Sequence, residues 1–221
     1  GCLGIPEFGT DFVIQMVVDT KPNTISDLIR ISGLSHGTDV WLNNAQELIR
    51  SGKATISTAI CTRDDIMIYL IKCGMSEKRS FKIMESVRKG RGLPDGAEEE
   101  MKEHGVPDWY IGSCKKIAYL FPKAHAVAYV MMAFRIAWFK VHEPLAFYAT
   151  FFSVRAKAFD AEYCCAGKDA VKRKIREIEN NKDATAVEQN LLTTLEVCYE
   201  FYLRGFHFDT INIYESDATK F

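Results

Sequence analysis

Apolar side chains recur every three or four positions through most of the chain, a spacing that is typical of helices with one buried face. Residues that start and stop helices divide this pattern into segments. Thr24, followed three residues later by Asp27, predicts a capped start, and Gly33 predicts the end of that helix before a loop over 34–39. The remaining helices are predicted over 10–20, 41–50, 62–74, 76–90, 124–142, 168–180 and 184–204.

The C-terminal part of the chain has a different character. Residues 168–180 predict a highly charged surface helix, and the segment 206–214 predicts a short strand. We place a domain boundary near residues 155–159, with one domain over 1–155 and an incomplete second domain over 156–221. The predicted fold class is therefore mainly α, with many helices and one short β element near the C-terminus.

Composition and charge exclude several protein classes. Of the 221 residues, 48% are hydrophobic and 26% charged, as in an ordinary soluble globular protein, so disorder, collagen and coiled coil are excluded. With 28 basic against 29 acidic residues the formal charge is −1, so any contact with nucleic acid must come from a local patch. The seven cysteines contain no CxxC pair, which predicts reduced thiols of a cytosolic protein rather than disulfides or a structural metal.

Two further features concern membranes and processing. The most apolar stretch, 126–139, is interrupted by Arg135 and is shorter than the roughly 20 residues that span a bilayer, so we expect no transmembrane helix and no membrane partner. The sequence opens without an initiator Met or a signal-peptide pattern, so we expect a piece of a longer protein.

Residues 78–91 carry six basic side chains and one acid, Glu85. For the lysines of one helical stripe, a solvated surface is the simpler interpretation. Arg88 instead projects on the apolar side of its helix, where a guanidinium needs an anionic partner or an opening. With Lys89 and Arg91 it predicts a cationic corner that is suited to phosphate.

Arg63 begins a helix whose residues 66–71 are apolar nearly all round, which predicts a buried helix with an anion site at its start. The adjacent Asp64 and Asp65 are expected to cap this helix rather than to bind a metal, because neighbouring carboxylates in a first turn point about 100° apart.

Phe121, Lys123 and His125 lead into the longest apolar helix, and His125 and Tyr129 share one of its faces. A core helix with a satisfied histidine is the alternative interpretation of this stripe. The chain has no Ser-His-Asp arrangement, Walker loop or glycine-rich turn after a strand, so we expect neither a complete catalytic site nor a metal site within it.

Taken together, these segments resemble the PolC-type alpha subunit of bacterial replicative DNA polymerase III, specifically its fingers region. The similarity runs from residue 3 to residue 221. An F-x-K-x-H-x-x-A-Y pattern over 121–129 is also similar to the wider C-family of replicative polymerases. The other matching segments are LGIPEFGT at 3–10, ISGLSHGTDVW at 31–41, RDDIM at 63–67 and KIMESVRKG at 82–90.

The resemblance implies template-directed DNA synthesis with primer–template DNA and deoxynucleoside triphosphates (dNTPs) in the bacterial cytoplasm. It implies a sliding clamp and other replisome subunits as partners of the full-length protein. It also implies two Mg²⁺ ions held by palm aspartates, and we find no palm segment in this chain, so the chain alone is expected to be inactive. The expected dNTP-binding residues are the triphosphate-neutralising Arg63, Arg88, Lys89, Arg91 and Lys123, and the base-pair-lining Ser35, His36, Phe121, His125 and Tyr129.

Two other classes of protein remain as alternatives. One is a stand-alone helical nucleic-acid-binding module that uses the 78–91 patch, although such modules ordinarily carry excess positive charge. The other is a scaffold domain whose apolar helix is only core, which gives no reason for Arg88 on an apolar face or for Lys123 at the start of another helix.

Overall fold

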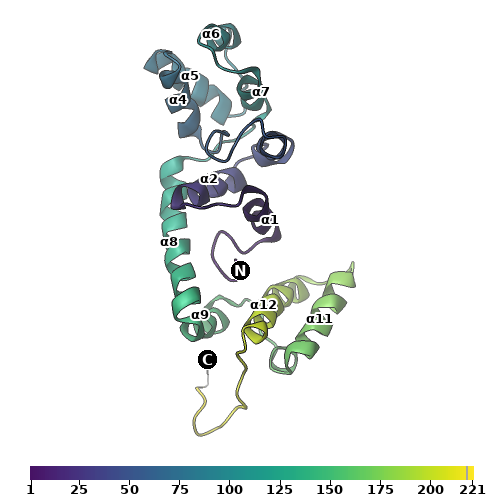
Figure 1. The fold of residues 1–221 in the computed structure, drawn as a ribbon. Coiled ribbons are helices and arrows are strands. Elements are labelled where there is room, and N and C mark those ends of the chain that lie inside the picture. The colour runs from purple at the N-terminus through teal and green to yellow at the C-terminus, as the bar shows by residue number, and fades with distance from the viewer. Residues whose placement is uncertain (218) are drawn as a thin grey trace. The chain divides into compact units, whose positions relative to one another are not determined.

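A computed structural model describes residues 1–217 and 219–221 (Figure 1). Its contacts divide the chain into two compact units, one made of residues 1–9 and 134–221 and the other of residues 10–133. The division lies within helix α8 (Lys123–His142). The predicted domain boundary between residues 155 and 156 separates the fingers from the region that follows them in the family. A division by contacts does not test such a boundary, so it stays a prediction.

The unit of residues 10–133 consists of helices joined by short loops. Helix α2 begins at a capping box in which Thr24 Oγ1 accepts from Asp27 N at 3.1 Å and Asp27 accepts from Thr24 N at 3.0 Å, as the sequence predicts. Helices α4 and α5 lie side by side through buried Ile66, Leu70 and Ile83 (Figure 1). The helices are α1 (Asp11–Thr20), α2 (Ile25–His36), α3 (Gln46–Arg50), α4 (Arg63–Lys72), α5 (Glu77–Arg88), α6 (Ala97–Glu103), α7 (Asp108–Lys116) and the first part of α8.

The other unit places two long helices side by side, α11 (Lys168–Asn180) and α12 (Ala186–Leu203) (Figure 1). Its core is rich in aromatic rings contributed by α9 (Pro144–Thr150), the irregular turn η2 (Phe151–Arg155) and α12. The short helix α10 (Ala161–Cys164) and the second part of α8 complete the unit. Figure 1 shows α8 as one continuous helix.

Two helix predictions need correction. Helix α2 continues through Gly33 to His36, so this glycine does not end it; a Cβ at Gly33 would lie 2.5 Å from Cys61 O, and the glycine therefore permits a close approach. The predicted helix over 41–50 is wrong in its first half, because η1 (Trp41–Ala45) contains non-helical residues and only α3 is regular. The buried Asn44 amide, which donates to Asp39 O and Ser113 O, holds the chain in this irregular shape.

The predicted β element over 206–214 is also wrong, since the described residues contain no strand and only one isolated bridge, between Thr38 and Tyr119. A strand needs a neighbouring strand to satisfy its backbone, and this segment has none. Phe206 and Phe208 instead pack as extended chain against the aromatic core, while Ile213 is 84% exposed.

Helices α4 and α8 also differ from expectation. Only Ile66 and Leu70 of α4 are buried and Ile68 is 48% exposed, so α4 is not buried all round. Helix α8 has 20 residues and extends beyond the stretch 126–139 at both ends; by length and composition alone it could cross a membrane, as a core helix of a soluble protein also could. It carries Arg135 and Lys140 within its length.

Candidate functional site

Residues 118–123, which we call the junction segment, connect the ends of three helices. Thr38, just after α2, donates its N–H to Tyr119 O at 3.0 Å and accepts from Tyr119 N at 3.2 Å. Leu120 N donates to Arg88 O at 3.3 Å, which fastens the last residue of α5 to the same segment. The loop after α2 and the cationic end of α5 are therefore held on one stretch of extended backbone.

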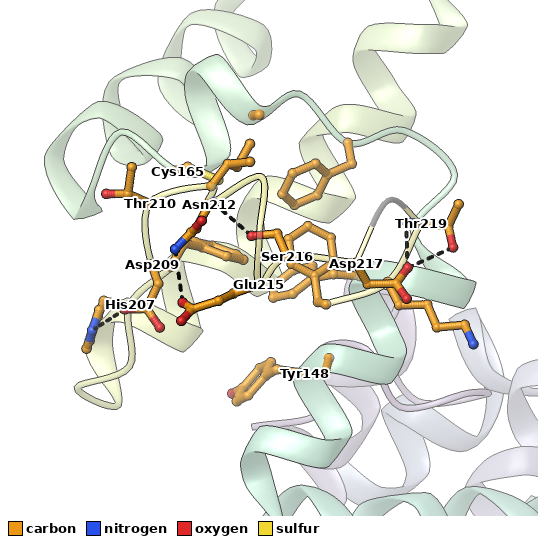
Figure 2. Close-up of a pocket in the computed structure, with 18 of the residues that line it drawn as sticks. Tyr148, Cys165, His207, Asp209, Thr210, Asn212, Glu215, Ser216, Asp217 and Thr219 are labelled. Carbon is orange, nitrogen blue, oxygen red and sulfur yellow. Dashed lines mark hydrogen bonds and ion pairs between the residues drawn. The ribbon is translucent and has the colours of Figure 1, made fainter.

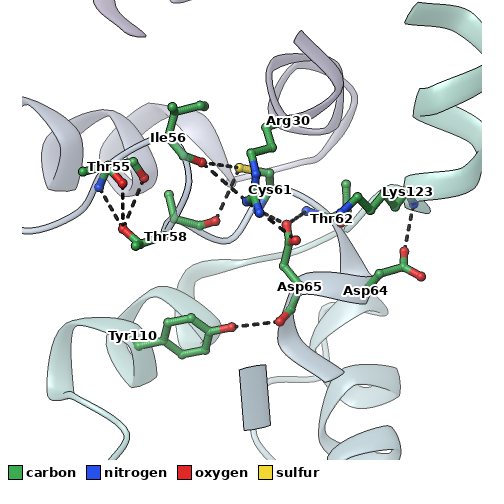
Figure 3. Close-up of polar contacts among 11 residues, drawn as sticks. Arg30, Thr55, Ile56, Thr58, Cys61, Thr62, Asp64, Asp65, Tyr110 and Lys123 are labelled. Carbon is green, nitrogen blue, oxygen red and sulfur yellow. Dashed lines mark hydrogen bonds and ion pairs between the residues drawn. The ribbon is translucent and has the colours of Figure 1, made fainter. Parts of the chain in front are cut away.

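The start of α4 is the third helix end on the junction segment. Arg63 N donates to Phe121 O at 3.1 Å, and Lys123 N donates to Asp64 Oδ2 at 2.8 Å. Figure 3 shows Asp64 on α4 turned toward Lys123 at the start of α8. These two bonds bring the first residues of α4 and α8 together, so Arg63 and Lys123 lie at adjoining helix starts although 60 positions separate them in sequence.

Asp65 fixes the N-terminus of α4 from the other side. Its Oδ2 accepts from Thr62 N at 2.9 Å and from Cys61 N at 3.1 Å, and its Oδ1 lies 3.6 Å from Arg30 Nη1 (Figure 3). The capping prediction is confirmed for Asp65, whereas Asp64 satisfies a backbone N–H at the start of α8 instead. Both carboxylates are thus engaged in holding helix ends.

Four aromatic rings form a continuous ladder along the junction. His36 and Phe121 are stacked with centroids 4.8 Å apart, Phe121 meets His125 edge-on at 4.9 Å, and His125 lies 4.6 Å from Tyr129. The His36 ring is fixed from behind, since its Nδ1 lies 2.8 Å from Ser32 O and 3.1 Å from Ser35 Oγ. His36 and His125 are exposed and Tyr129 is 45% exposed, so the ladder presents ring faces and edges to solvent.

The cationic corner at the end of α5 contains its own acid. Arg88 Nη2 donates to Glu85 Oε2 at 2.8 Å, Arg88 Nε also donates to Glu85, and Lys89 Nζ lies 3.0 Å from Glu85 Oε2. The hydrogen bond from Arg88, aided by Lys89, lowers the pKa of Glu85 to about 2. Arg88 therefore has the anionic partner that its position requires, and the corner keeps a net charge from Lys89 and the exposed Arg91.

All the residues predicted for the site lie in the unit of residues 10–133. Backbone hydrogen bonds bring Arg63, Phe121 and Lys123 together, and the aromatic ladder links His36, His125 and Tyr129 to them. Ser35 Oγ lies within hydrogen-bonding distance of His36 Nδ1, and the backbone carbonyl of Arg88 accepts from Leu120 N of the junction segment.

Sequence reasoning missed two partners within the site. Glu85 could have been found, because spacings of three and four residues to Arg88 and Lys89 are those of helical ion pairs. The contact of Asp64 with Lys123 joins positions that are distant in the chain, and no local pattern indicates it.

The chemistry of this site is that of binding. Its exposed rings can stack on a planar heterocycle, and its cations can neutralise an anion. Within residues 1–217 and 219–221 no three His, Cys, Asp or Glu side chains gather to hold a metal ion. Burial raises the pKa of the nearby Cys61 thiol to about 12, so this cysteine stays protonated at neutral pH and is no nucleophile.

A cavity of about 1150 Å³ lies in the other unit, and none of the predicted site residues lines it. Aromatic side chains including Tyr148 and Phe208 line it together with polar residues of the C-terminal segment, several of which are labelled in Figure 2. There His207 Nε2 lies 3.2 Å from Asp209 Oδ1, and Asn212 Nδ2 donates to Glu215 at 3.0 Å.

The sequence of the whole chain is similar to known polymerases. Residues 1–106 match a family model described as the bacterial DNA polymerase III alpha subunit finger domain. The chain is 62% identical, over all of its length, to a DNA polymerase III PolC-type from Caldanaerobacter subterraneus subsp. tengcongensis. The chain belongs to the PolC-type DNA polymerase III family.

Other PolC-type relatives match equally completely. A DNA polymerase III PolC-type from Halalkalibacterium halodurans is 57% identical and one from Clostridium perfringens 55% identical, each over the whole chain. The chain spans only 16%, 16% and 15% of the length of these three relatives. It therefore corresponds to one segment of a PolC-type replicative polymerase. Neither a stand-alone module nor a scaffold explains a match that extends over the whole of this chain.

Proposed function

We propose that this segment binds the incoming dNTP and the nascent base pair during template-directed DNA synthesis by a PolC-type polymerase. The observation that carries the proposal is the junction segment, which joins the starts of α4 and α8 to the ends of α2 and α5. In such a polymerase, a primer 3′-hydroxyl attacks the α-phosphate of the dNTP, and catalysis depends on positioning and charge neutralisation.

The side chains divide into two groups with different tasks. Arg63, Lys123, Lys89 and Arg91 neutralise the triphosphate, because all four cations lie at helix ends on or next to the junction segment. Arg88 contributes positive charge when its guanidinium, which donates to Glu85, also donates to the triphosphate.

The aromatic ladder takes the other task. A base pair is flat and apolar on its faces, and exposed rings such as those of His125 and Tyr129 offer a surface on which it can stack. Ser35 and His36 line the same surface from the end of α2, with Phe121 between the two sets of rings.

Mg²⁺ does not fit among the residues described here. Asp64 and Asp65 are adjacent carboxylates at the start of α4, and both already accept hydrogen bonds from backbone N–H groups at helix starts. The two Mg²⁺ ions of the reaction are therefore held by carboxylates of the palm, elsewhere in the polymerase. This segment supplies binding and orientation but no metal ligand.

The remaining proposals concern the whole polymerase. Its partners are primer–template DNA, dNTPs, a sliding clamp and other replisome subunits, its compartment is the bacterial cytoplasm, and no membrane takes part. Residues 1–155 belong to the fingers, and residues 156–221 begin the duplex-binding region.

The test is steady-state kinetics of primer extension by the PolC-type polymerase that contains this segment, with Arg63→Gln or Lys123→Gln. Each change removes a charged contact to phosphate worth about 1.5–3 kcal/mol, so the KM for dNTP should rise by about 10- to 150-fold. The backbone N–H groups that build the junction are unchanged in both variants.

The matched control is Lys78→Gln, which removes an exposed cation of α5 away from the junction segment. Its KM for dNTP should equal that of the wild type. An unchanged KM in both Arg63→Gln and Lys123→Gln, with normal thermal unfolding, refutes the assignment.

A further inference from the structure

Two cysteines of the unit of residues 1–9 and 134–221 lie together in its core although 34 positions separate them in sequence. Cys164 is the last residue of α10, and Cys198 belongs to α12. Both are free thiols, and both are buried in the same aromatic core. Their side chains share a hydrogen bond in which the Cys198 thiol donates to the sulfur of Cys164. They therefore form a buried dithiol pair.

One stripe of α12 holds Cys198 against the segment that contains α10. Thr194, Cys198 and Tyr202 recur every four residues, so they share a face of the helix. Thr194 Oγ1 donates to Ala158 O at 2.6 Å. Tyr202 OH donates to Cys164 O, the carbonyl of the paired cysteine itself, at 2.9 Å. Hydrogen bonds one turn before and one turn after Cys198 thus fix the two thiols side by side.

The two thiols differ in reactivity. The hydrogen bond from Cys198 stabilises the thiolate of Cys164 and lowers its pKa, whereas the same bond and burial raise the pKa of Cys198. The thiolate is the nucleophilic form, so Cys164 is the thiol that reacts first. Cys61 and Cys114 are also buried, but burial raises the pKa of each to about 12, so both stay protonated at neutral pH.

A small oxidant has a route to this pair. Cys165, next to Cys164 in sequence, is exposed and lines the cavity of about 1150 Å³ (Figure 2). Ala161, at the other end of α10, lines the same cavity. Helix α10 has only four residues, and so short a helix opens more readily than the long helix α12. Local opening of α10 admits a molecule as small as hydrogen peroxide to Cys164.

We propose that Cys164 and Cys198 form a reversible disulfide when the protein meets a peroxide. The Cys164 thiolate attacks one oxygen of the peroxide, the O–O bond breaks, and a sulfenic acid forms on Cys164. The hydroxide that leaves takes up the proton that Cys164 had lost. Cys198 then attacks the sulfenic sulfur, and the departing hydroxide takes the Cys198 proton. Two electrons from the thiols thus reduce one peroxide to two molecules of water.

The disulfide joins α10 to α12 and closes a loop that contains α11. It also protects Cys164, because a sulfenic acid that finds no second thiol is oxidised further to a sulfinic acid, which thiols do not reduce. A disulfide, in contrast, is returned to two thiols by exchange with other thiols. The pair is therefore a site of reversible oxidation.

The experiment treats the PolC-type polymerase that contains this segment with hydrogen peroxide. The remaining thiols are alkylated with iodoacetamide in denaturant, and tryptic peptides are mapped by mass spectrometry without a reductant. Peptide 158–168, which contains Cys164 and Cys165, should be linked to peptide 183–204, which contains Cys198. Fragment ions should place the alkyl group on Cys165. Dithiothreitol, added before alkylation, should abolish the linked species.

Single variants identify the partners. In Cys198→Ala the link should be absent, and peptide 158–168 should gain the two oxygens of a sulfinic acid at Cys164. Cys165→Ala is the matched control and should keep the link, because this thiol is not a member of the pair. Cys61 and Cys114 are internal controls in every sample, and both should be fully alkylated after unfolding.

Three results would overturn the proposal. The first is a wild-type protein in which peroxide oxidises any of the seven cysteines but does not link the two peptides. The second is a link that persists in Cys198→Ala. The third is loss of the link in Cys165→Ala with normal thermal unfolding, which would make Cys165 the reacting thiol. None of these readouts uses primer extension, so the outcome is independent of the proposed function.

Discussion

Lys140 sits in a buried polar network within the unit of residues 1–9 and 134–221. Its side chain is 4% exposed, and its Nζ lies 2.6 Å from Glu200 Oε1, 3.0 Å from Gly1 O and 2.6 Å from Leu3 O. Tyr148 OH donates to the same Glu200 oxygen at 2.6 Å. We predict that Lys140→Met is strongly destabilising, because it removes the nearer cation from the Glu200 carboxylate, whose other ion pair, to the N-terminal ammonium of Gly1, is longer at 3.9 Å.

The magnitude follows from burial. Removing one partner of a buried ion pair typically costs about 3–5 kcal/mol, since the remaining charge is left uncompensated, and this pair is only 4% and 16% exposed. The same change also deprives Gly1 O and Leu3 O of a donor. In Lys140→Met/Glu200→Gln the unpaired charge is gone, so the double variant should be about 2 kcal/mol more stable than Lys140→Met.

Native-state hydrogen exchange measures the loss where it occurs. The opening free energy of α12 amides, which lie in the same unit, should fall by about 3–5 kcal/mol in Lys140→Met. Amides of α4 belong to the other unit and are the internal control. A surface comparison is Lys102→Met, whose partner Glu98 is 31% exposed; solvent screens this pair, so the loss should be much smaller than in Lys140→Met.

Two results would refute this reasoning. A loss in Lys140→Met no larger than in Lys102→Met would show that the buried pair behaves like a surface pair. A double variant that is less stable than Lys140→Met would show that the cost comes from lost packing of the lysine stem and not from the unpaired carboxylate.

Three further changes give predictions of different sign. Gly33→Ala should destabilise the protein by about 1–3 kcal/mol, since its Cβ would lie 2.5 Å from Cys61 O. Gly112→Ala, whose Cβ meets nothing within 4 Å in α7, should raise the unfolding temperature through about 0.5–1 kcal/mol of helix propensity; thermal unfolding tests both. The pKa of Glu85 is lowered from 4.5 to about 2, so its stabilisation is present above pH 4.5 and is lost as the pH falls through about 2. Urea unfolding of Glu85→Gln across this range should show a smaller acid loss than the wild type.

Helix ends that depend on short-range chemistry could be predicted from the sequence. The capping pair at Thr24 joins residues three positions apart, so the pattern contains the whole interaction. The charged helix over 168–180 was also predicted with its observed bounds. Its strong separation of apolar and polar faces leaves little choice of structure.

The sequence was misleading where a distant contact decides the conformation. Gly33 resembles a helix stop, but its purpose is the close approach of Cys61. Asn44 prevents a helix over 41–45 through a bond to Ser113, 69 positions away. The segment 206–214 has strand-forming residues, but nothing in its own sequence shows that no partner strand exists.

The candidate site was predicted as a set of residues but not as an arrangement. Local charge and helix position indicate Arg63, Arg88, Lys89 and Arg91, and helical periodicity places His125 and Tyr129 on one face; the resemblance gives them their roles and adds the other residues. The junction segment, which joins Thr38, Arg88 and Arg63, depends on backbone hydrogen bonds that carry no sequence signal. The ion pair of Arg88 with Glu85 follows the i, i+3 spacing of helical ion pairs, so the sequence contains this signal.

The junction segment also determines which mutations a lineage can accumulate. Tyr119, Leu120 and Lys123 hold three helix ends through their amide groups, so most side-chain replacements at 119 and 120 leave the register of the cations untouched. Proline is the exception, because it has no N–H to donate. Selection at positions 119 and 120 therefore acts on the backbone N–H. Among related sequences, we expect many different side chains at these two positions but very few prolines.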